Sequence, residues 1–202
     1  MSNQRVNSYC LLLASVIMLG SCRETANPRP KGYFRIDLPN HEYAVFNSDF
    51  TQAAGLPLSF EYPVYGKISI DPDEFTEPGW FNIDFQSYKA KIYLTYKEID
   101  NDLENLKDQT YRMNVKNHII KADAISEQMI IDPERDVYGI LYDLKGSTAT
   151  AVQFFLTDST KHFFRGSLYF FSEPNPDSLA PVNEFFREDI IHIIETLKWK
   201  DQ

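Results

Sequence analysis

The four histidines of this 202-residue chain are the first candidates for acid–base or metal chemistry. They show no H-x-x-x-H pair and no other metal-ligand spacing, and they stand at His41, His118, His162 and His192. His192 lies near Glu188 and Glu195 on the polar side of a C-terminal helical pattern, which favours an exposed histidine in a helical charge pattern. The sequence therefore predicts no metal centre and no cofactor.

Two acidic clusters contain carboxylates that could bind Ca²⁺, namely DPDEF at Asp71–Phe75 and DPERD at Asp132–Asp136. Neither has the glycine and the ligand spacing of an EF-hand loop, and Asp-Pro is itself turn chemistry, so solvated turns are favoured. The chain has no G-x-S-x-G elbow and no phosphate-binding glycine loop, and GSTATA at Gly146–Ala151 is typical of a turn that enters a strand. Spacing singles out no carboxylate pair for hydrolysis, so we expect no enzyme.

Cys22 has the surroundings that point most clearly to chemistry. It follows a short apolar run, Leu11–Leu19, and the two small residues Gly20 and Ser21. A membrane-spanning helix needs about 20 apolar residues, whereas the apolar core of an export signal needs only about 7 to 15 before its cleavage point. The charged and proline-containing residues after Cys22 could not continue a helix through hydrocarbon. Residues 1–21 are therefore predicted to be a signal peptide that is removed.

The residues Leu19-Gly20-Ser21-Cys22 resemble a bacterial lipobox, in which an apolar residue and two small residues precede a cysteine. The resemblance implies that the Cys22 thiol is diacylated, that the chain is cut after Ser21 and that the new amino group is usually acylated too. The alternative is an ordinary secretory signal with an incidental cysteine, which the small residues and the length of the apolar run disfavour. At about 0.8 kcal/mol per buried methylene, two or three acyl chains give stable anchoring.

The charge of the chain narrows its possible partners. The full chain carries a net charge of −9, and loss of residues 1–21, whose only charged side chain is Arg5, makes it −10. Nucleic acid and polybasic membrane attachment both need clustered Lys and Arg, so we expect no nucleic acid partner and anchoring by the lipid alone. With Cys10 removed and Cys22 alkylated, no disulfide can form, and stability must come from the core.

The mature chain is predicted to be a lipidated tether, residues 22–32, followed by a single α+β domain, residues 33–202. YFRIDLP (33–39) and LSFEYPVY (58–65) are loosely specified strands broken by prolines. Six stronger strand candidates are rich in β-branched and aromatic residues: WFNIDF (80–85), AKIYLTYKEI (90–99), AISEQMIID (124–132), VYGILYDL (137–144), TAVQFFLTDS (150–159) and HFFRGSLYFF (162–171). Short loops predict an antiparallel meander for the last three. Both faces of VYGILYDL are largely apolar, so helices should cover both sides of the sheet.

Two helices are available to cover the sheet. The first is predicted from about Asn101 to Ala122, with Asn101 and Glu104 spaced as a capping box. The second starts near Asp177 or Ser178, tolerates Pro181 in its first turn and places on one face Val182, Phe185, Phe186, Ile190, Ile193, Ile194 and Leu197. This order of elements is similar to the Mog1/PsbP-like fold, in which an antiparallel sheet lies between helices.

Nine segments behind the lipobox closely resemble, in the same order, the gliding motility lipoprotein GldD family of Bacteroidetes-type bacteria: RPKGYFRIDLP, FEYPVYG, WFNIDF, KIYLTYK, KADAISE, VYGILYDLKG, QFFLTDSTKHFFRGSLYF, PNPDSLAPV and DIIHIIETLKWK. The resemblance implies a lipoprotein required for surface gliding, a process coupled to type IX secretion, with other envelope proteins as partners. It supplies no catalytic residue and maps only the lipidated cysteine, onto Cys22.

Two functions remain open at this point. One is a membrane-anchored, non-enzymatic component of the gliding and secretion machinery, and the other is an envelope module that binds a lipid or glycan. An apolar pocket lined by Tyr and Phe would favour the binding module, whereas a flat aromatic patch would favour the machinery component. Arg23 is not the aspartate that signals inner-membrane retention in some bacteria, which favours the outer membrane, on its periplasmic side.

Overall fold

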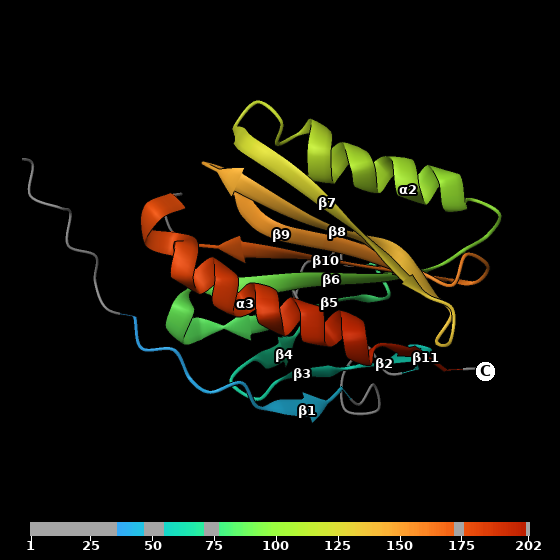
Figure 1. Ribbon diagram of the computed structural model, residues 1–202. Helices are drawn as coiled ribbons and strands as arrows, with labels where there is room; N and C mark the ends of the chain where they lie inside the picture. Colours follow the sequence, from blue (N-terminus) through green and yellow to red (C-terminus); the bar gives the residue numbers. More distant parts are fainter. Residues whose placement is uncertain (1–35, 47–54, 71–76, 172–175, 201–202) are drawn as a thin grey trace, which may run out of the picture. The chain divides into compact units, whose positions relative to one another are not determined.

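The computed structural model describes residues 36–46, 55–70, 77–171 and 176–200, without the side chains of residues 176–178. All of them belong to one compact unit, Phe34–Gln202. Its centre is a seven-stranded antiparallel sheet of order β4-β5-β6-β10-β9-β8-β7 (Figure 1). The strands are β4 (Lys67–Ser69), β5 (Trp80–Phe85), β6 (Ala90–Glu98), β7 (Ala122–Asp132), β8 (Val137–Gly146), β9 (Thr150–Thr157) and β10 (His162–Phe170).

The six strong strand candidates correspond to β5–β10, and their ends differ from the predicted ends by at most two residues. Strands β8, β9 and β10 are neighbours in the sheet, so the predicted meander is confirmed. The turn from β8 to β9 passes through Gly146, whose φ of 108° lies in the left-handed region that favours glycine. The predicted fold class is confirmed: the chain is an α+β protein whose antiparallel sheet is flanked by helices.

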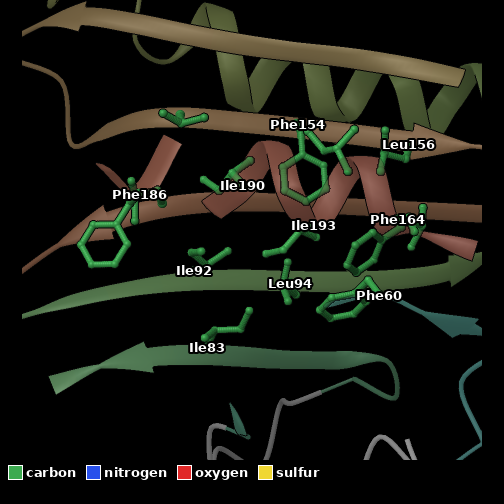
Figure 2. Close-up of a cluster of buried hydrophobic side chains, with 14 of the residues drawn as sticks. Phe60, Ile83, Ile92, Leu94, Phe154, Leu156, Phe164, Phe186, Ile190 and Ile193 are labelled. Carbon is green, nitrogen blue, oxygen red and sulfur yellow. The ribbon is translucent and has the colours of Figure 1, made fainter. Parts of the chain in front are cut away.

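Helix α3 (Pro176–Thr196) covers one face of the sheet (Figure 1). In Figure 2, Phe186, Ile190 and Ile193 of α3 lie against sheet residues such as Ile92, Leu94 and Phe154. All seven predicted apolar positions of this helix are buried. The helix begins at Pro176, because proline suits a first helical position, so the prediction that Pro181 lies in the first turn was wrong. Among the described helices, none is both long and apolar enough to cross a membrane.

Helix α2 (Leu103–Tyr111) and the π-helical turn η3 (Arg112–Lys116) pack on the opposite face. They build a second, smaller core from Leu106, Val115, Tyr142, Leu144, Phe155 and Phe163. The predicted capping box is absent from this helix, because Asn101 has a φ of 55° and Glu104 instead accepts a hydrogen bond from Lys107 Nζ at 2.9 Å. The helix is also shorter than predicted, since the chain leaves the helical path after η3 and Ile120 is 91% exposed.

Four short strands form two small sheets beside the main one. β1 (Tyr43–Val45) pairs with β3 (Glu61–Pro63), and β2 (Leu58–Ser59) pairs with β11 (Lys198–Trp199). The predicted strand 58–65 is therefore divided between β2 and β3, and β3 ends at Pro63, which cannot donate to a ladder. Residues 36–39 of the predicted strand 33–39 do not form a strand, and the rest of that segment lies outside the described residues.

Candidate functional site

Cys22, the predicted lipidation site, and the acidic cluster Asp71–Phe75 both lie outside the described residues. The second acidic cluster forms the turn between β7 and β8, as predicted. Asp132 accepts hydrogen bonds from the backbone N–H groups of Glu134 and Arg135, both at 3.1 Å, and from Arg135 Nε at 2.7 Å. The side-chain bond from Arg135 is the main reason that the pKa of Asp132 lies below its usual range.

Arg135 has a second role that sequence analysis missed. Its Nη1 donates to the carbonyl oxygens of Ile194 (3.1 Å) and Leu197 (3.0 Å), at the C-terminal end of α3. The last carbonyls of a helix have no partner within the helix, so a guanidinium in this position satisfies them and complements the helix dipole. The DPERD turn is thus a structural link between the β7–β8 hairpin and α3.

The four histidines lie in separate surroundings. His118 follows η3, and burial lowers its pKa. His162 shares a hydrogen bond with Tyr96 Oη at 2.8 Å and stacks on Trp199. His41 contacts Asp189 of α3, and His192, itself on α3, contacts Glu61 of β3. Across the described ranges, no group of three or more His, Cys, Asp and Glu side chains is arranged to hold a metal ion.

Asp189 is the centre of a buried polar network that sequence analysis did not identify. It lies on α3 and its exposed fraction is 0%. Tyr65 Oη donates to its two carboxylate oxygens at 2.7 and 2.6 Å, and Tyr43 Oη donates to Oδ1 at 3.1 Å. His41 Nδ1 lies 2.8 Å from the same Oδ1. Burial raises the pKa of Asp189 despite these hydrogen bonds.

The network extends from Asp189 to β3. Tyr43 stacks on His192 with ring centroids 3.5 Å apart, and His192 Nε2 lies 2.7 Å from Glu61 Oε2. The prediction of an exposed His192 among helical charges was wrong, because its partner comes from β3 and its side chain is about three-quarters covered. Together these contacts attach the β1–β3 sheet to α3. The signal in the sequence was the position of Asp189, one helical turn after Phe185 on the apolar stripe.

A second polar group lies on the α2-facing side of the sheet, beside the smaller core that α2 and η3 cover. Directly paired residues of antiparallel strands point to the same face. Three adjacent rows of paired residues therefore lie on one face, and we call each row a rung. The rungs are Trp80↔Thr95↔Arg165, Asn82↔Tyr93↔Ser167↔Gln153 and Lys91↔Tyr169. We call six of these residues the aromatic–arginine cluster: Trp80, Tyr93, Gln153, Arg165, Ser167 and Tyr169. It crosses β5, β6, β10 and β9.

The rings of this cluster differ in how far they reach solvent. Trp80 is 38% exposed, whereas Tyr93 and Tyr169 are half-buried and meet edge to face with centroids 5.5 Å apart. Lys91 Nζ lies 5.2 Å from the centre of the Tyr93 ring and 3.3 Å from Asp84 Oδ1. The pKa of Tyr169 is raised by burial. The cluster thus presents aromatic rings, and the neighbouring Lys91 is already paired with the Asp84 carboxylate.

Arg165 differs from Lys91 in its partners. Its Nη1 donates to the sulfur of Met113 at 3.3 Å, and in the part of the chain that the structure describes no carboxylate forms an ion pair with it. Glu77, the nearest acidic influence on Arg165, is bonded to Lys97 at 3.1 Å. Because the Arg165 guanidinium is partly removed from water, burial lowers its pKa. Among the described residues, the positive charge of the cluster therefore has no negative partner.

Gln153 has one amide atom without a partner in the described ranges. Ser167 Oγ donates to Gln153 Oε1 at 3.2 Å, while Nε2 has no hydrogen bond to any described residue although Gln153 is only 2% exposed. A buried donor of this kind normally costs about 1–3 kcal/mol. Beside the third rung, a pocket of about 250 Å³ is lined by Asp84, Phe85, Gln86, Lys89, Ala90 and Phe171. Its lining combines charged and apolar side chains, unlike the apolar Tyr and Phe pocket that a lipid-binding module would need.

The comparisons with known proteins agree with the resemblance found in the sequence. The gliding motility lipoprotein GldD family matches residues 23–199, so the chain belongs to this family. It is accordingly a gliding-motility-related lipoprotein associated with the cell envelope. No curated protein matches the chain.

Among solved structures, the chain is similar to the solution structure of cyanobacterial PsbP (CyanoP) from Synechocystis sp. PCC 6803. The sequence identity is 12% and the TM-score is 0.45, over 82% of this chain and 97% of that chain.

Proposed function

We propose that this chain is a lipoprotein anchored through Cys22 that acts as a non-enzymatic component of the gliding and type IX secretion machinery. The observation that carries the proposal is the family match, which begins at residue 23, directly after the lipobox cysteine. An acyl anchor on Cys22 keeps a domain at one surface, and a tether of about ten residues lets it reach some 25–30 Å from the bilayer. We further propose that this surface is the periplasmic side of the outer membrane.

The polar networks of the described residues support a non-enzymatic role. Asp189 is surrounded by tyrosines and His41, and Asp132 is bonded to Arg135, so both carboxylates are used to join elements of the fold. General acid–base catalysis needs a side chain that can reach a substrate proton. Asp189 has no exposed surface. These groups therefore serve the packing of the domain.

The anchor is tested by metabolic labelling with a palmitate analogue. The Cys22→Ala variant should lose the label and accumulate as a precursor or in the wrong compartment. Cys10→Ala is the matched control, because it removes the other cysteine of the chain from within the predicted signal peptide and should leave the label unchanged. Persistent label on the Cys22→Ala protein would refute the lipid anchor.

The non-enzymatic role is tested by substitution of the polar side chains. Alanine at each histidine, and at the carboxylates of Asp71–Glu74 and Asp132–Asp136, should leave gliding intact wherever the protein still accumulates in the envelope. The amounts of protein are compared by immunoblot and the spreading of colonies is measured on agar. A variant that accumulates normally yet does not spread would replace the proposal with an enzymatic or metal-binding role.

A further inference from the structure

The aromatic–arginine cluster combines three chemical features on one side of the sheet. Trp80 offers an exposed ring, and within the described part of the chain Arg165 has no carboxylate partner and the buried Gln153 Nε2 has no acceptor. Neither the anchor nor the proposed role in the machinery uses them. Buried polar groups are normally satisfied, and each exception needs an explanation.

The Arg165 guanidinium and Gln153 Nε2 are both hydrogen-bond donors. A guanidinium presents its N–H groups in a planar fork that fits carboxylate and phosphate oxygens, and Gln153 Nε2 lies one rung and one strand away from it. Ser167, paired to Gln153 across β9 and β10, has a hydroxyl that can also accept or donate. The chemistry of the cluster therefore selects a ligand rich in acceptor oxygens that carries at least one negative charge.

The aromatic rings restrict the class of ligand further. Trp80, Tyr93 and Tyr169 lie on successive rungs of the same face, so their spacing follows the sheet. Aromatic rings bind the C–H faces of pyranose rings, while the equatorial hydroxyls remain free to bond with polar neighbours. A lipid would instead need an apolar cavity, and the adjoining 250 Å³ pocket contains Asp84 and Lys89.

From this arrangement we propose that the aromatic–arginine cluster binds an acidic saccharide, with its carboxylate or phosphate on Arg165, a sugar hydroxyl on Ser167 and a sugar ring against Trp80. The site retains a local positive charge in a chain whose net charge is −9. That overall charge weakens the attraction of anions elsewhere on the surface, so binding depends on Arg165. The proposal stands beside the role in the machinery and does not depend on it.

The site is tested by isothermal titration calorimetry on the full lipidated chain in detergent. The probes are tri-galacturonate and mannose 6-phosphate, with galactotriose and mannose as the neutral counterparts. The acidic probes should bind and the neutral ones should bind at least about tenfold more weakly, because they lack the charge-assisted hydrogen bond. Binding by only one acidic probe would identify whether the anion is a carboxylate or a phosphate.

Three substitutions locate the binding. Arg165→Gln and Trp80→Ala should each weaken the acidic probe at least about tenfold, while Lys198→Gln, which removes an exposed positive charge on β11, should leave the affinity unchanged. Thermal melts establish that each variant is folded, and Ser167→Ala provides a smaller change if Arg165→Gln does not fold. No binding of either acidic probe by the folded chain would overturn the proposal. Equal binding of the neutral probes, or equal binding of a tetraglutamate peptide, would overturn it too.

Discussion

Removal of the Tyr65 hydroxyl should destabilise the domain more than removal of any other tyrosine hydroxyl around Asp189. Tyr65 Oη reaches both carboxylate oxygens at 2.7 and 2.6 Å, whereas Tyr43 Oη reaches Oδ1 at 3.1 Å. A hydrogen bond to a charged group contributes about 1.5–3 kcal/mol, and Asp189 has no exposed surface through which water could replace it. We therefore expect Tyr65→Phe to lower the free energy of unfolding by about 1.5–3 kcal/mol.

The assay is urea unfolding followed by circular dichroism, with two comparison variants. Tyr43→Phe should lose less than Tyr65→Phe, because its bond is longer and reaches a single oxygen. Tyr62→Phe is the matched control, since the Tyr62 hydroxyl has no hydrogen bond among the described residues, and it should stay within about 0.5 kcal/mol of the wild type. Equal unfolding free energies for Tyr65→Phe and Tyr62→Phe would refute the assignment of the network.

The same variant has a predicted pH dependence. Burial raises the folded-state pKa of Asp189, so its contribution to stability is fully present below the ordinary value of about 3.9 and is lost as the pH rises through the folded pKa. The Tyr65 hydroxyl is the strongest influence that lowers this pKa, and its removal raises the pKa further. The loss caused by Tyr65→Phe should therefore be larger at pH 8 than at pH 4. A loss that grows toward acid pH would contradict the sign.

Three further predictions concern the core, a strand and a turn. Phe186→Ala removes a fully buried ring whose centroid lies 4.5 Å from that of Phe85. The substitution should lower the free energy of unfolding in urea by about 3–5 kcal/mol, and a smaller loss would indicate that the core closes around the site. Gly139→Ala would place a Cβ against a backbone carbonyl of β9, which cannot move away. We expect it to lower the free energy of unfolding by about 1–3 kcal/mol or more in the same assay, and an unchanged unfolding midpoint would contradict this close approach. Asp132→Asn should remove stability that is present above about pH 4 and is lost as the pH falls through the lowered folded pKa of Asp132. A pH titration of the melting temperature checks this, and a difference from the wild type that grows toward acid pH would contradict it.

The long elements could be predicted from the sequence because each carries its own periodicity. β5 to β10 are each six or more residues long and rich in β-branched and aromatic residues, and α3 has an apolar stripe that is buried against the sheet. The strands β1, β4 and β11 are two or three residues long, which is too short for any alternation to be visible. Their formation depends on neighbours that are distant in the chain, such as the pairing of β11 with β2.

The candidate sites were less accessible to sequence analysis for a related reason. Arg165 and Gln153 are in strands whose residues read as ordinary core, and only the register between β9, β10 and β6 places them on one face. Asp189 and its tyrosines are separated by more than 120 residues. The prediction of Cys22 as the lipidation site rests on four consecutive residues, Leu19 to Cys22, so it requires no tertiary contact.

The central claim is that the domain must be held at a membrane by Cys22 in order to support gliding. Tethering gives an effective concentration that can reach roughly millimolar beside partners at the same surface, which a freely diffusing copy lacks. The direct measurement is colony spreading of a deletion strain that expresses, at native level, a soluble periplasmic form with an ordinary secretory signal and no Cys22. We predict that this form folds and accumulates but does not restore spreading, whereas the lipidated chain does. Full spreading with the soluble form would contradict the claim.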